Sequence, residues 1–239
     1  MKEKIRYPYG QEDPYAKVEL ISSTVVHSEK YHVDQMPVLA ARVSHAQSGK
    51  TGQSSEGDKK LMHYLADNLH MTPFEHQSAT FRVVLPNFVI KHWLRHRTQS
   101  YNEVSMRYSS DPVGKFHFPK VWREQATRNK QSSAGAVEDQ EGCTKILQKA
   151  YDDSLDAYKK LLEKNVCREQ ARFVVPVGNY TEFYATANLR NWAHFYKLRI
   201  AEDAQWEIRQ YARCVGEILG EIWPDSWGAL SLSKSVNRV

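Results

Sequence analysis

The densest group of side chains capable of chemistry lies in residues 95–108, which read RHRTQSYNEVSMRY. The segment combines three arginines and a histidine with hydroxyl and amide side chains and a single carboxylate, Glu103. A solvated charge run usually mixes lysine with glutamate, whereas the planar guanidinium of arginine binds a phosphate through two parallel hydrogen bonds. We therefore predict that this segment binds one or more phosphorylated ligands.

Further arginines extend this pattern downstream, each in a mixed or apolar stretch: Arg172, Arg190 and Arg199. Arg168 and Arg172 are four residues apart, so they share a face if the segment CREQARF forms a helix. The alternative is a surface of unrelated arginines.

Two other motifs resemble known sites only in part. Residues 44–51, SHAQSGKT, approach a phosphate-binding loop, but Ser44 stands where that motif has its first glycine, which favours a surface loop. His92 and His96 have the i, i+4 spacing of zinc ligands, but no glutamate lies between them. The neighbouring arginines would also repel a cation, so we predict no metal site.

The cysteines, Cys143, Cys167 and Cys214, are far apart, which excludes the framework of a disulfide-stapled secreted protein. Cys167 lies beside Arg168, an arrangement that can activate a thiol at the start of a helix. Such a cysteine is more often part of the packing, so we predict no cysteine nucleophile.

Hydrophobic periodicity indicates which elements position these residues. It predicts strands at residues 18–26, 78–85 and 181–188, and helices at 38–46, 58–70, after Pro86, 144–164, around 167–176, 189–200 and 203–222. Residues 47–57 and 123–142 are polar and predict loops. Because the elements alternate too irregularly for a doubly wound sheet, we predict an α+β fold with a mixed or antiparallel sheet and a helical layer.

The composition is that of a globular protein, since 41% of the 239 residues are hydrophobic and 26% are charged. We predict a single domain over residues 1–239, with a peripheral arm at 1–16, a peripheral tail at 226–239 and a loop at 123–142. The net charge of +5 is compatible with nucleic acid and with small anions. No apolar run approaches the ~18 residues of a membrane span, and the first residues lack the apolar region of a signal peptide. We therefore expect a cytoplasmic protein.

The segment 95–108 resembles the signature of the flavin-dependent thymidylate synthases, in which Arg-His-Arg is followed by seven residues and a serine, here Ser105. Other blocks that resemble this family are AARVS (40–44), HMTPFEH (70–76), the segment 171–176, NLRNWAHFYKLR (188–199) and AQWEIRQYA (204–212). The resemblance extends over about residues 18–224.

The resemblance implies the fold of that family and the reductive methylation of dUMP to dTMP. The methylene group would come from methylenetetrahydrofolate, and the hydride from FAD that NADPH has reduced. It also implies a homotetramer whose active sites combine residues from several subunits, with no role for nucleic acid or a membrane.

By position, the resemblance assigns contacts with FAD to His70, Thr72, Glu75, Arg95, His96, Arg97, Asn188, Arg190 and His194. It assigns contacts with dUMP to His92, Arg95, Glu103, Val104, Ser105, Met106, Arg107, Arg172 and Arg199. Arg199 would be the catalytic arginine that favours ionisation of the uracil imide. A guanidinium cannot accept a proton near neutral pH, but it can stabilise an anionic uracil ring without a covalent bond to the enzyme.

Two assigned residues call for a choice. His92 stands where many relatives of the family carry glutamine, and because histidine ordinarily titrates near pH ~6.5 we expect the affinity for dUMP to depend on pH. Ser105 could act as a nucleophile only with Glu103 as its base, so we favour a hydrogen-bonding role.

Two other functions compete with this one. A nucleic-acid-binding module could use segment 95–108, although the basic residues are spread over several blocks and Glu103 lies in the densest part. A metal hydrolase could be built on the histidines. Flavin absorption, stoichiometric zinc and salt-sensitive binding of DNA distinguish the three.

Overall fold

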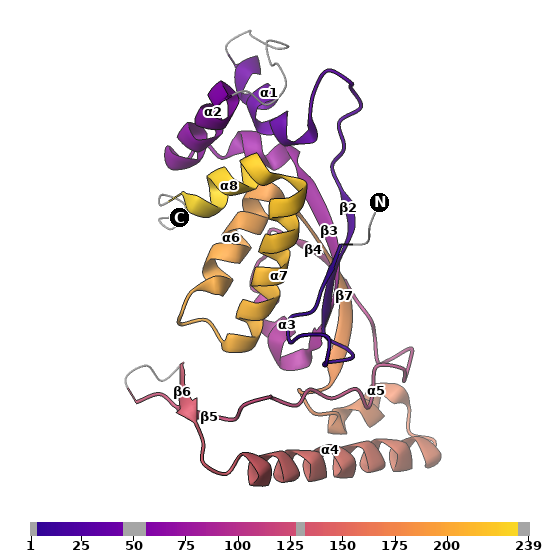
Figure 1. Ribbon diagram of the computed structural model, residues 1–239. Helices are drawn as coiled ribbons and strands as arrows, with labels where there is room; N and C mark the ends of the chain where they lie inside the picture. Colours follow the sequence, from indigo (N-terminus) through magenta and orange to yellow (C-terminus); the bar gives the residue numbers. More distant parts are fainter. Residues whose placement is uncertain (1–3, 45–55, 128–131, 234–239) are drawn as a thin grey trace.

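The sheet at the centre of the protein has five strands, and every pairing within it is antiparallel (Figure 1). The computed structural model describes residues 4–44, 56–127 and 132–233. In sheet order, the strands are β1 (Ile5–Arg6), β2 (Lys17–Ser23), β3 (Ser78–Pro86), β7 (Tyr180–Asn188) and β4 (Ser100–Glu103). The α+β fold with an antiparallel sheet is confirmed, and so are the strands predicted from alternation.

The long strands β3 and β7 form the middle of the sheet and pair along their whole length, with Ser78 opposite Asn188. Successive side chains of a strand point to opposite faces. Phe81 and Phe183 belong to the alternate residues that are buried on one face, and the residues between them are more exposed. One face of the sheet therefore carries the core.

The helices are α1 (Met36–Val43), α2 (Glu56–Asp67), α3 (Asn87–Trp93), α4 (Gln140–Glu163), α5 (Arg168–Ala171), α6 (Leu189–Ile200), α7 (Trp206–Ile222) and α8 (Pro224–Leu232), with the 3-10 turns η1 (Val33–Gln35), η2 (Thr72–His76) and η3 (Arg172–Val174). Helices α6 and α7 pack over the apolar face of the sheet (Figure 1). The rings of Trp93, Trp192 and Phe195 pack together in the core. These contacts hold the end of α3 against α6.

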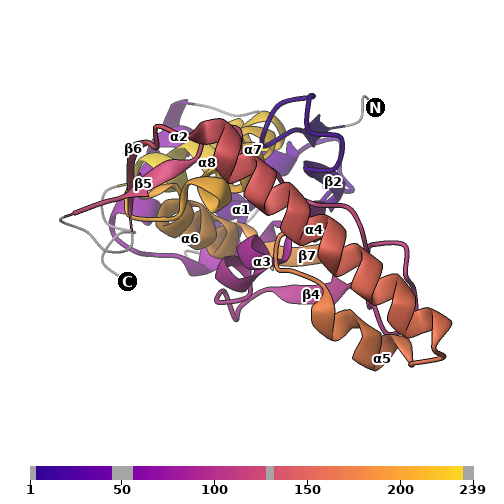
Figure 2. The same cartoon turned by 90° about the horizontal axis from the view of Figure 1, so that it is seen from below.

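The 24-residue helix α4 lies apart from this core, and Figure 2 shows it crossing the lower end of the molecule with α5 near its last turns. A hairpin of β5 (Arg123–Gln125) and β6 (Ser133–Ala136) precedes α4, so the loop predicted at 123–142 is wrong for these residues. Arg123 Nη2 lies 2.7 Å from Glu207 Oε1. Because Glu207 is buried and needs a counter-charge, this ion pair ties the hairpin to α7.

Both ends of the described chain belong to the fold, which contradicts the prediction of a peripheral arm and a peripheral tail. β1 pairs with β2, and Tyr9 is buried with its ring stacked on Trp206. Trp227 and Leu230 of α8 are buried as well. Strand pairing and ring stacking fix these residues in ways that their polar neighbours in the sequence did not indicate.

Parts of several predictions lie outside the described residues, namely 1–3 of the arm, 45–46 of the helix at 38–46, 47–55 of the polar loop, 128–131 of the loop at 123–142 and 234–239 of the tail. Within the described ranges, no helix is long and apolar enough to cross a membrane.

Candidate active site

A cavity of about 240 Å³ lies between the chain that follows α3 and the first turns of α6. Five of the residues predicted to contact FAD line it, namely Arg95, His96, Arg97, Arg190 and His194. Met71, Thr98 and Asn191 complete the lining. The fold therefore brings two distant segments into one pocket that carries three guanidinium groups.

A hydrogen-bonded turn after α3 holds one wall of this pocket. The His96 N–H donates to the Trp93 carbonyl (3.0 Å), and the Tyr101 hydroxyl donates to the His96 carbonyl (2.8 Å). The Trp93 indole N–H donates to Gln99 Oε1 (3.0 Å). Because Trp93 is fully buried, these bonds anchor the turn to the core and fix the position of His96.

The N-terminus of α6 holds the other wall. Asn188 is the N-cap, and its side-chain oxygen accepts a hydrogen bond from the Asn191 N–H at 2.9 Å. The side-chain amide of Asn191 donates to the Thr98 carbonyl at 3.3 Å and so joins the two walls. Asn188, predicted to contact FAD, does not line the cavity and caps the helix that does.

Arg199 and His96 form a direct pair. Arg199 Nε donates a hydrogen bond to His96 Nε2 at 2.9 Å. Burial and then the charges of Arg199 and His194 lower the pKa of His96 to about 3. The ring is therefore neutral, and because Nε2 is the acceptor, the ring proton is on Nδ1. Burial and the charge of Arg95 lower the pKa of Arg199, but an arginine stays protonated in proteins.

The other two histidines near this pair are also biased toward the neutral form. Burial and then the charge of Arg190 lower the pKa of His194. Burial and then the charge of Arg199 lower the pKa of His92, against the opposing effect of a hydrogen bond with Gln205. The positive charge of the site comes from arginines, so it does not depend on pH near neutrality.

Of the residues before β3 that were predicted to contact FAD, none lines the cavity within one chain. Glu75 forms an ion pair with Nη1 of Arg190 and so stands at the rim of the cavity. His70 and Thr72 are exposed and do not line it, whereas the intervening Met71 is buried and does.

Six of the residues predicted to bind dUMP, namely Glu103 to Arg107 and Arg172, lie at the end of β4 or beside α5. Glu103 accepts a hydrogen bond from the buried Thr181 hydroxyl at 2.7 Å. Arg107 Nε donates to Glu169 Oε2 at 3.0 Å, and Arg172 Nε donates to the backbone carbonyl of Glu169 at 3.3 Å. Glu169, which the sequence analysis missed, therefore holds two of the predicted nucleotide-binding arginines near each other.

The turn between these groups is held by its own backbone. The Val104 N–H donates to the Glu182 carbonyl at 2.9 Å, Ser105 Oγ accepts from the Arg107 N–H at 3.2 Å, and Met106 is half-buried. Ser105 bonds the backbone, and no hydrogen bond joins it to Glu103 within the described residues. The arrangement of nucleophile and base that Ser105 would need is therefore not formed.

Within one chain most of the residues assigned to dUMP lie away from the cavity, although Arg199 is bonded to His96 of its lining. Of the residues assigned to dUMP, Arg95 alone lines the cavity of about 240 Å³. The residues that sequence reasoning missed there, Met71, Thr98 and Asn191, each follow or precede a predicted residue in the chain. Their position beside the motif was the only signal for them.

The cysteines and the possible metal ligands form no site of their own. Burial raises the pKa of the Cys214 thiol to about 12, which leaves it protonated at neutral pH. Neither Cys214, Cys143 nor Cys167 lines the cavity. In the ranges that the structure describes, no group of three His, Cys, Asp or Glu side chains could hold a metal ion.

Among the described residues, three arginines of this region are each engaged by a different side chain, whereas a nucleic-acid-binding surface is expected to carry a continuous basic stripe. Arg107 is paired with Glu169, Arg190 with Glu75, and Arg199 is bonded to His96. This pairing disfavours the nucleic-acid-binding alternative.

Comparisons with known proteins agree with this geometry. A family model described as thymidylate synthase complementing protein matches residues 24–225. The flavin-dependent thymidylate synthase of Thermus thermophilus is 47% identical over 196 residues, which cover 82% of this chain and 71% of that protein. The enzyme of the same name from Thermosipho melanesiensis is 41% identical over 193 residues, which cover 80% and 82%. The crystal structure of the UMP/dUMP methylase PolB from Streptomyces cacaoi, bound with 5-Br dUMP, superposes with a TM-score of 0.81 at 31% identity and covers 92% of this chain and 96% of that one.

Proposed function

This chain belongs to the thymidylate synthase complementing protein family, that of the flavin-dependent thymidylate synthases, and on this premise we propose that the cavity of about 240 Å³ and the arginines around Glu169 together serve the reductive methylation of dUMP to dTMP. Methylenetetrahydrofolate supplies the one-carbon group, and NADPH supplies the reducing electrons. When bound, FAD supplies the hydride that reduces the transferred methylene to a methyl group. The protein's own side chains bind and polarise the reactants.

The residues that line the cavity fit a flavin dinucleotide. Arg95, Arg97 and Arg190 offer forked N–H donors for a pyrophosphate. The cavity lies beside the first turns of α6, where the helix dipole favours an anion. The neutral imidazoles of His96 and His194 can lie against a flat ring without adding charge. We assign these five residues to FAD.

Arg199 would stabilise the uracil imide anion. Its Nε is committed to His96, and among the described residues its Nη1 and Nη2 have no hydrogen-bond partner. These terminal groups are free to donate to a uracil oxygen, where fixed donors lower the free energy of developing negative charge. The Arg199–His96 pair at the edge of an arginine-lined pocket is the observation that carries the proposal.

Arg107 and Arg172 would hold the phosphate of dUMP. Both already bond to Glu169, so they lie near each other at the surface. A phosphate dianion competes for the exposed Arg107–Glu169 pair with more charge than a carboxylate. His92 and the turn 103–106 would contact the rest of the nucleotide.

A single copy of the chain does not enclose these ligands. A volume of about 240 Å³ is below the range of roughly 300–1,000 Å³ for ligand pockets, and FAD is a large ligand. We therefore infer that neighbouring copies complete each site, in the homotetramer that the resemblance to the family implies. The side chains of Ile146 on α4 and Phe173 on η3 are 73% and 77% exposed, which suits them to such contacts.

Mixing two inactive variants tests this shared site. If Arg172 and Arg199 serve one site from different copies, Arg172→Ala and Arg199→Ala mixed within one oligomer restore part of the activity. Sedimentation velocity gives the size of the oligomer, and mass spectrometry verifies that the copies have mixed. Mixed oligomers without any recovered activity would contradict the shared site.

An assay of the purified protein tests the activity itself. We expect it to bind FAD with flavin absorption and to form dTMP from dUMP only when methylenetetrahydrofolate and NADPH are both present. UMP is assayed as a second compound, because the similar solved structure is that of a UMP/dUMP methylase. A colourless protein that added FAD cannot reconstitute, or turnover that is independent of flavin, would refute the proposal.

We further propose that residues 1–239 form one domain that works in the cytoplasm. The sheet, α6 and α7 share one core with Tyr9 at one end of the chain and Leu230 at the other, which supports a single unit. Limited proteolysis that releases a stable fragment, or fractionation of the protein away from the cytoplasm, would contradict this.

A further inference from the structure

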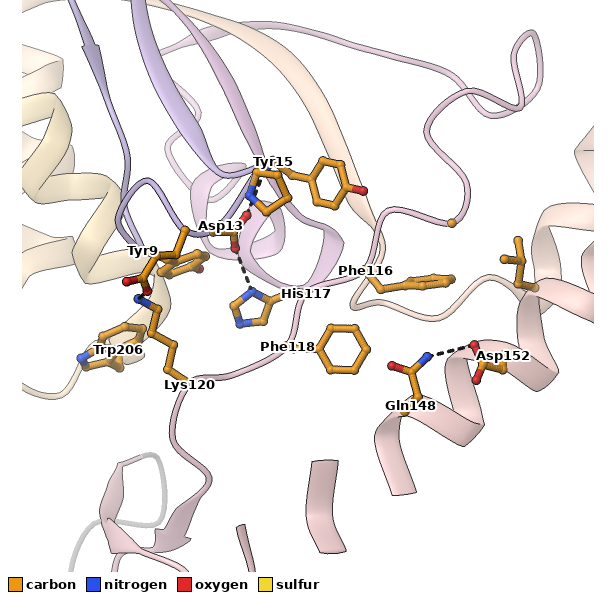
Figure 3. A pocket seen from close by; sticks show the side chains of 14 residues that line it. Tyr9, Asp13, Tyr15, Phe116, His117, Phe118, Lys120, Gln148, Asp152 and Trp206 are labelled. Carbon is orange, nitrogen blue, oxygen red and sulfur yellow. Dashed lines mark hydrogen bonds and ion pairs between the residues drawn. The ribbon is translucent and has the colours of Figure 1, made fainter. Parts of the chain in front are cut away.

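A second cavity, of about 490 Å³, lies between residues 9–15, residues 114–120 and α4 (Figure 3). None of its lining residues is among those assigned to FAD or dUMP, and residues 9–15 precede the range that the family model matches. We propose that this cavity binds a flat organic cation that carries N–H donors, such as a guanidinium or an amidinium.

The buried polar group of this cavity is His117, which is 6% exposed. The Tyr180 hydroxyl donates to Asp13 Oδ2 at 2.6 Å and lies 3.1 Å from His117 Nδ1. Because the hydroxyl proton is used on Asp13, His117 Nδ1 is the donor to the hydroxyl oxygen, and in the neutral imidazole Nε2 is then an acceptor. Among the described residues, Nε2 has no hydrogen-bond partner. A buried acceptor without a partner calls for an N–H donor.

The orientation of His117 is fixed by its surroundings. Its backbone N–H donates to the Gly178 carbonyl (2.9 Å), and its carbonyl accepts from the Tyr151 hydroxyl (2.9 Å). Figure 3 shows one ring nitrogen directed toward Asp13 and the other directed away from it, on the side of Lys120. The unpartnered Nε2 therefore faces this side of the cavity.

The charged and amide side chains of the lining offer more acceptors than donors. Gln148 donates one amide N–H to Asp152 Oδ1 at 2.9 Å, and its own oxygen and Asp152 Oδ2 remain to accept. Lys120 Nζ forms an ion pair with Glu12 Oε2 at 2.6 Å. With Asp13, the lining holds three carboxylates and one ammonium group. This negative balance repels phosphates and attracts a cation with several N–H donors.

Aromatic rings supply the rest of the lining. Phe116, Phe118, Tyr9 and Trp206 stand around the space in Figure 3, and Phe118 is 37% exposed. A guanidinium or amidinium is flat and weakly hydrated, so it stacks on such rings while its N–H groups reach acceptors at the edge. A compact, strongly hydrated ammonium matches this lining less well.

Calorimetric titration with benzamidine tests the proposal. We expect one saturable site per chain and binding of the neutral isostere benzamide at least ~10-fold weaker, because it lacks the charge. Asp152→Asn should weaken benzamidine binding roughly 3- to 10-fold, since this carboxylate is exposed and partly screened. Asp153→Asn is the matched control, because Asp153 is on the same helix, pairs with Lys149 and does not line the cavity.

Phe118→Ala provides a second variant that removes the exposed ring and should also weaken benzamidine. Equal binding of benzamide and benzamidine, an equal effect of the Asp152 and Asp153 variants, or no saturable binding would each overturn the proposal. These are binding measurements, so they do not depend on thymidylate synthesis.

The guanidinium could be free in solution or belong to an arginine of a second copy of this chain. Agmatine, a free guanidinium, distinguishes the two sources. If the natural ligand is free, the affinity for agmatine is the same at every protein concentration. If it is an arginine of a second copy, the affinity falls as self-association increases. Either result supports the proposed chemistry.

Discussion

Arg199 Nε lies 2.9 Å from His96 Nε2, and this bond joins the last turn of α6 to the turn that follows α3. A neutral imidazole that accepts from a guanidinium fixes the orientation of the arginine without neutralising its charge. The terminal N–H groups of Arg199 therefore keep their full electrostatic strength for a substrate. Tyr101, which donates to the His96 carbonyl, holds the imidazole from behind.

Removing this guanidinium should abolish most of the turnover. We expect Arg199→Ala to lower kcat by roughly 100- to 1,000-fold, because a fixed donor to developing negative charge is lost. Arg199→Lys keeps the charge but loses the forked guanidinium, so its kcat should lie between that of Arg199→Ala and that of the unchanged protein. Arg213→Ala is the control, since Arg213 donates to Gln210 on its own helix and does not line the cavity. Steady-state formation of dTMP measures the effect, and a kcat near that of the unchanged protein would contradict the role.

His96 should make the protein less stable in acid. Its pKa is about 3 in the folded state, against ~6.5 for an unfolded chain. Between these values the unfolded state binds more protons, so the free energy of unfolding falls as pH decreases below ~6.5, by up to about 1.4 kcal/mol per pH unit. Above ~6.5 the His96 contribution is constant.

His96→Gln tests this linkage, because glutamine does not titrate and its oxygen can accept from Arg199. Urea unfolding at pH ~7.5 and ~5 should show a smaller loss of stability for His96→Gln than for the unchanged protein. His76→Gln is the exposed control. The same loss in all three proteins would show that His96 does not contribute.

How far the sequence predicts this structure depends on whether the signal is local. The strands at 78–85 and 181–188 follow from alternation, and the helices from the spacing of their apolar residues. The convergence of Arg95 and Arg190 on one cavity followed from the resemblance, since periodicity says nothing about which distant segments meet. Glu169 was missed because its role depends on the packing of α5 near β4.

The N-terminal residues also show that a local sequence pattern does not predict long-range contacts. Residues 1–16 are polar and rich in proline and tyrosine, which predicts an arm. In the structure, Tyr9 is buried by stacking on Trp206, nearly two hundred residues away, and Asp13 accepts from Tyr180. Long-range ring and hydrogen-bond contacts of this kind leave no periodic trace in a sequence.

A chain without cysteines should remain an active enzyme. We expect the triple variant Cys143→Ala, Cys167→Ala, Cys214→Ala to form dTMP at a substantial fraction of the original kcat, because the Arg199 mechanism needs no thiolate. Cys214 is buried, so its replacement should cost about 1 kcal/mol of stability. Activity is therefore measured well below the Tm of the variant. Loss of turnover in a folded, FAD-loaded triple variant would argue against the mechanism.

His92 should make the affinity for dUMP depend on pH only in the acid range. Burial and the charge of Arg199 lower its pKa, so the ring is neutral at pH 7 and the titration expected from the sequence moves to lower pH. Protonation adds positive charge beside an anionic nucleotide, so binding should tighten as pH falls below ~6.5.

The phosphate of dUMP itself titrates near pH ~6, so its titration would obscure that of His92 if one protein alone were measured. The ratio of the dUMP dissociation constants of His92→Gln and the unchanged protein cancels that contribution. We expect a constant ratio above pH ~6.5 that rises steadily below it, and a ratio that stays flat down to pH ~5 would exclude a titrating contact between His92 and the nucleotide.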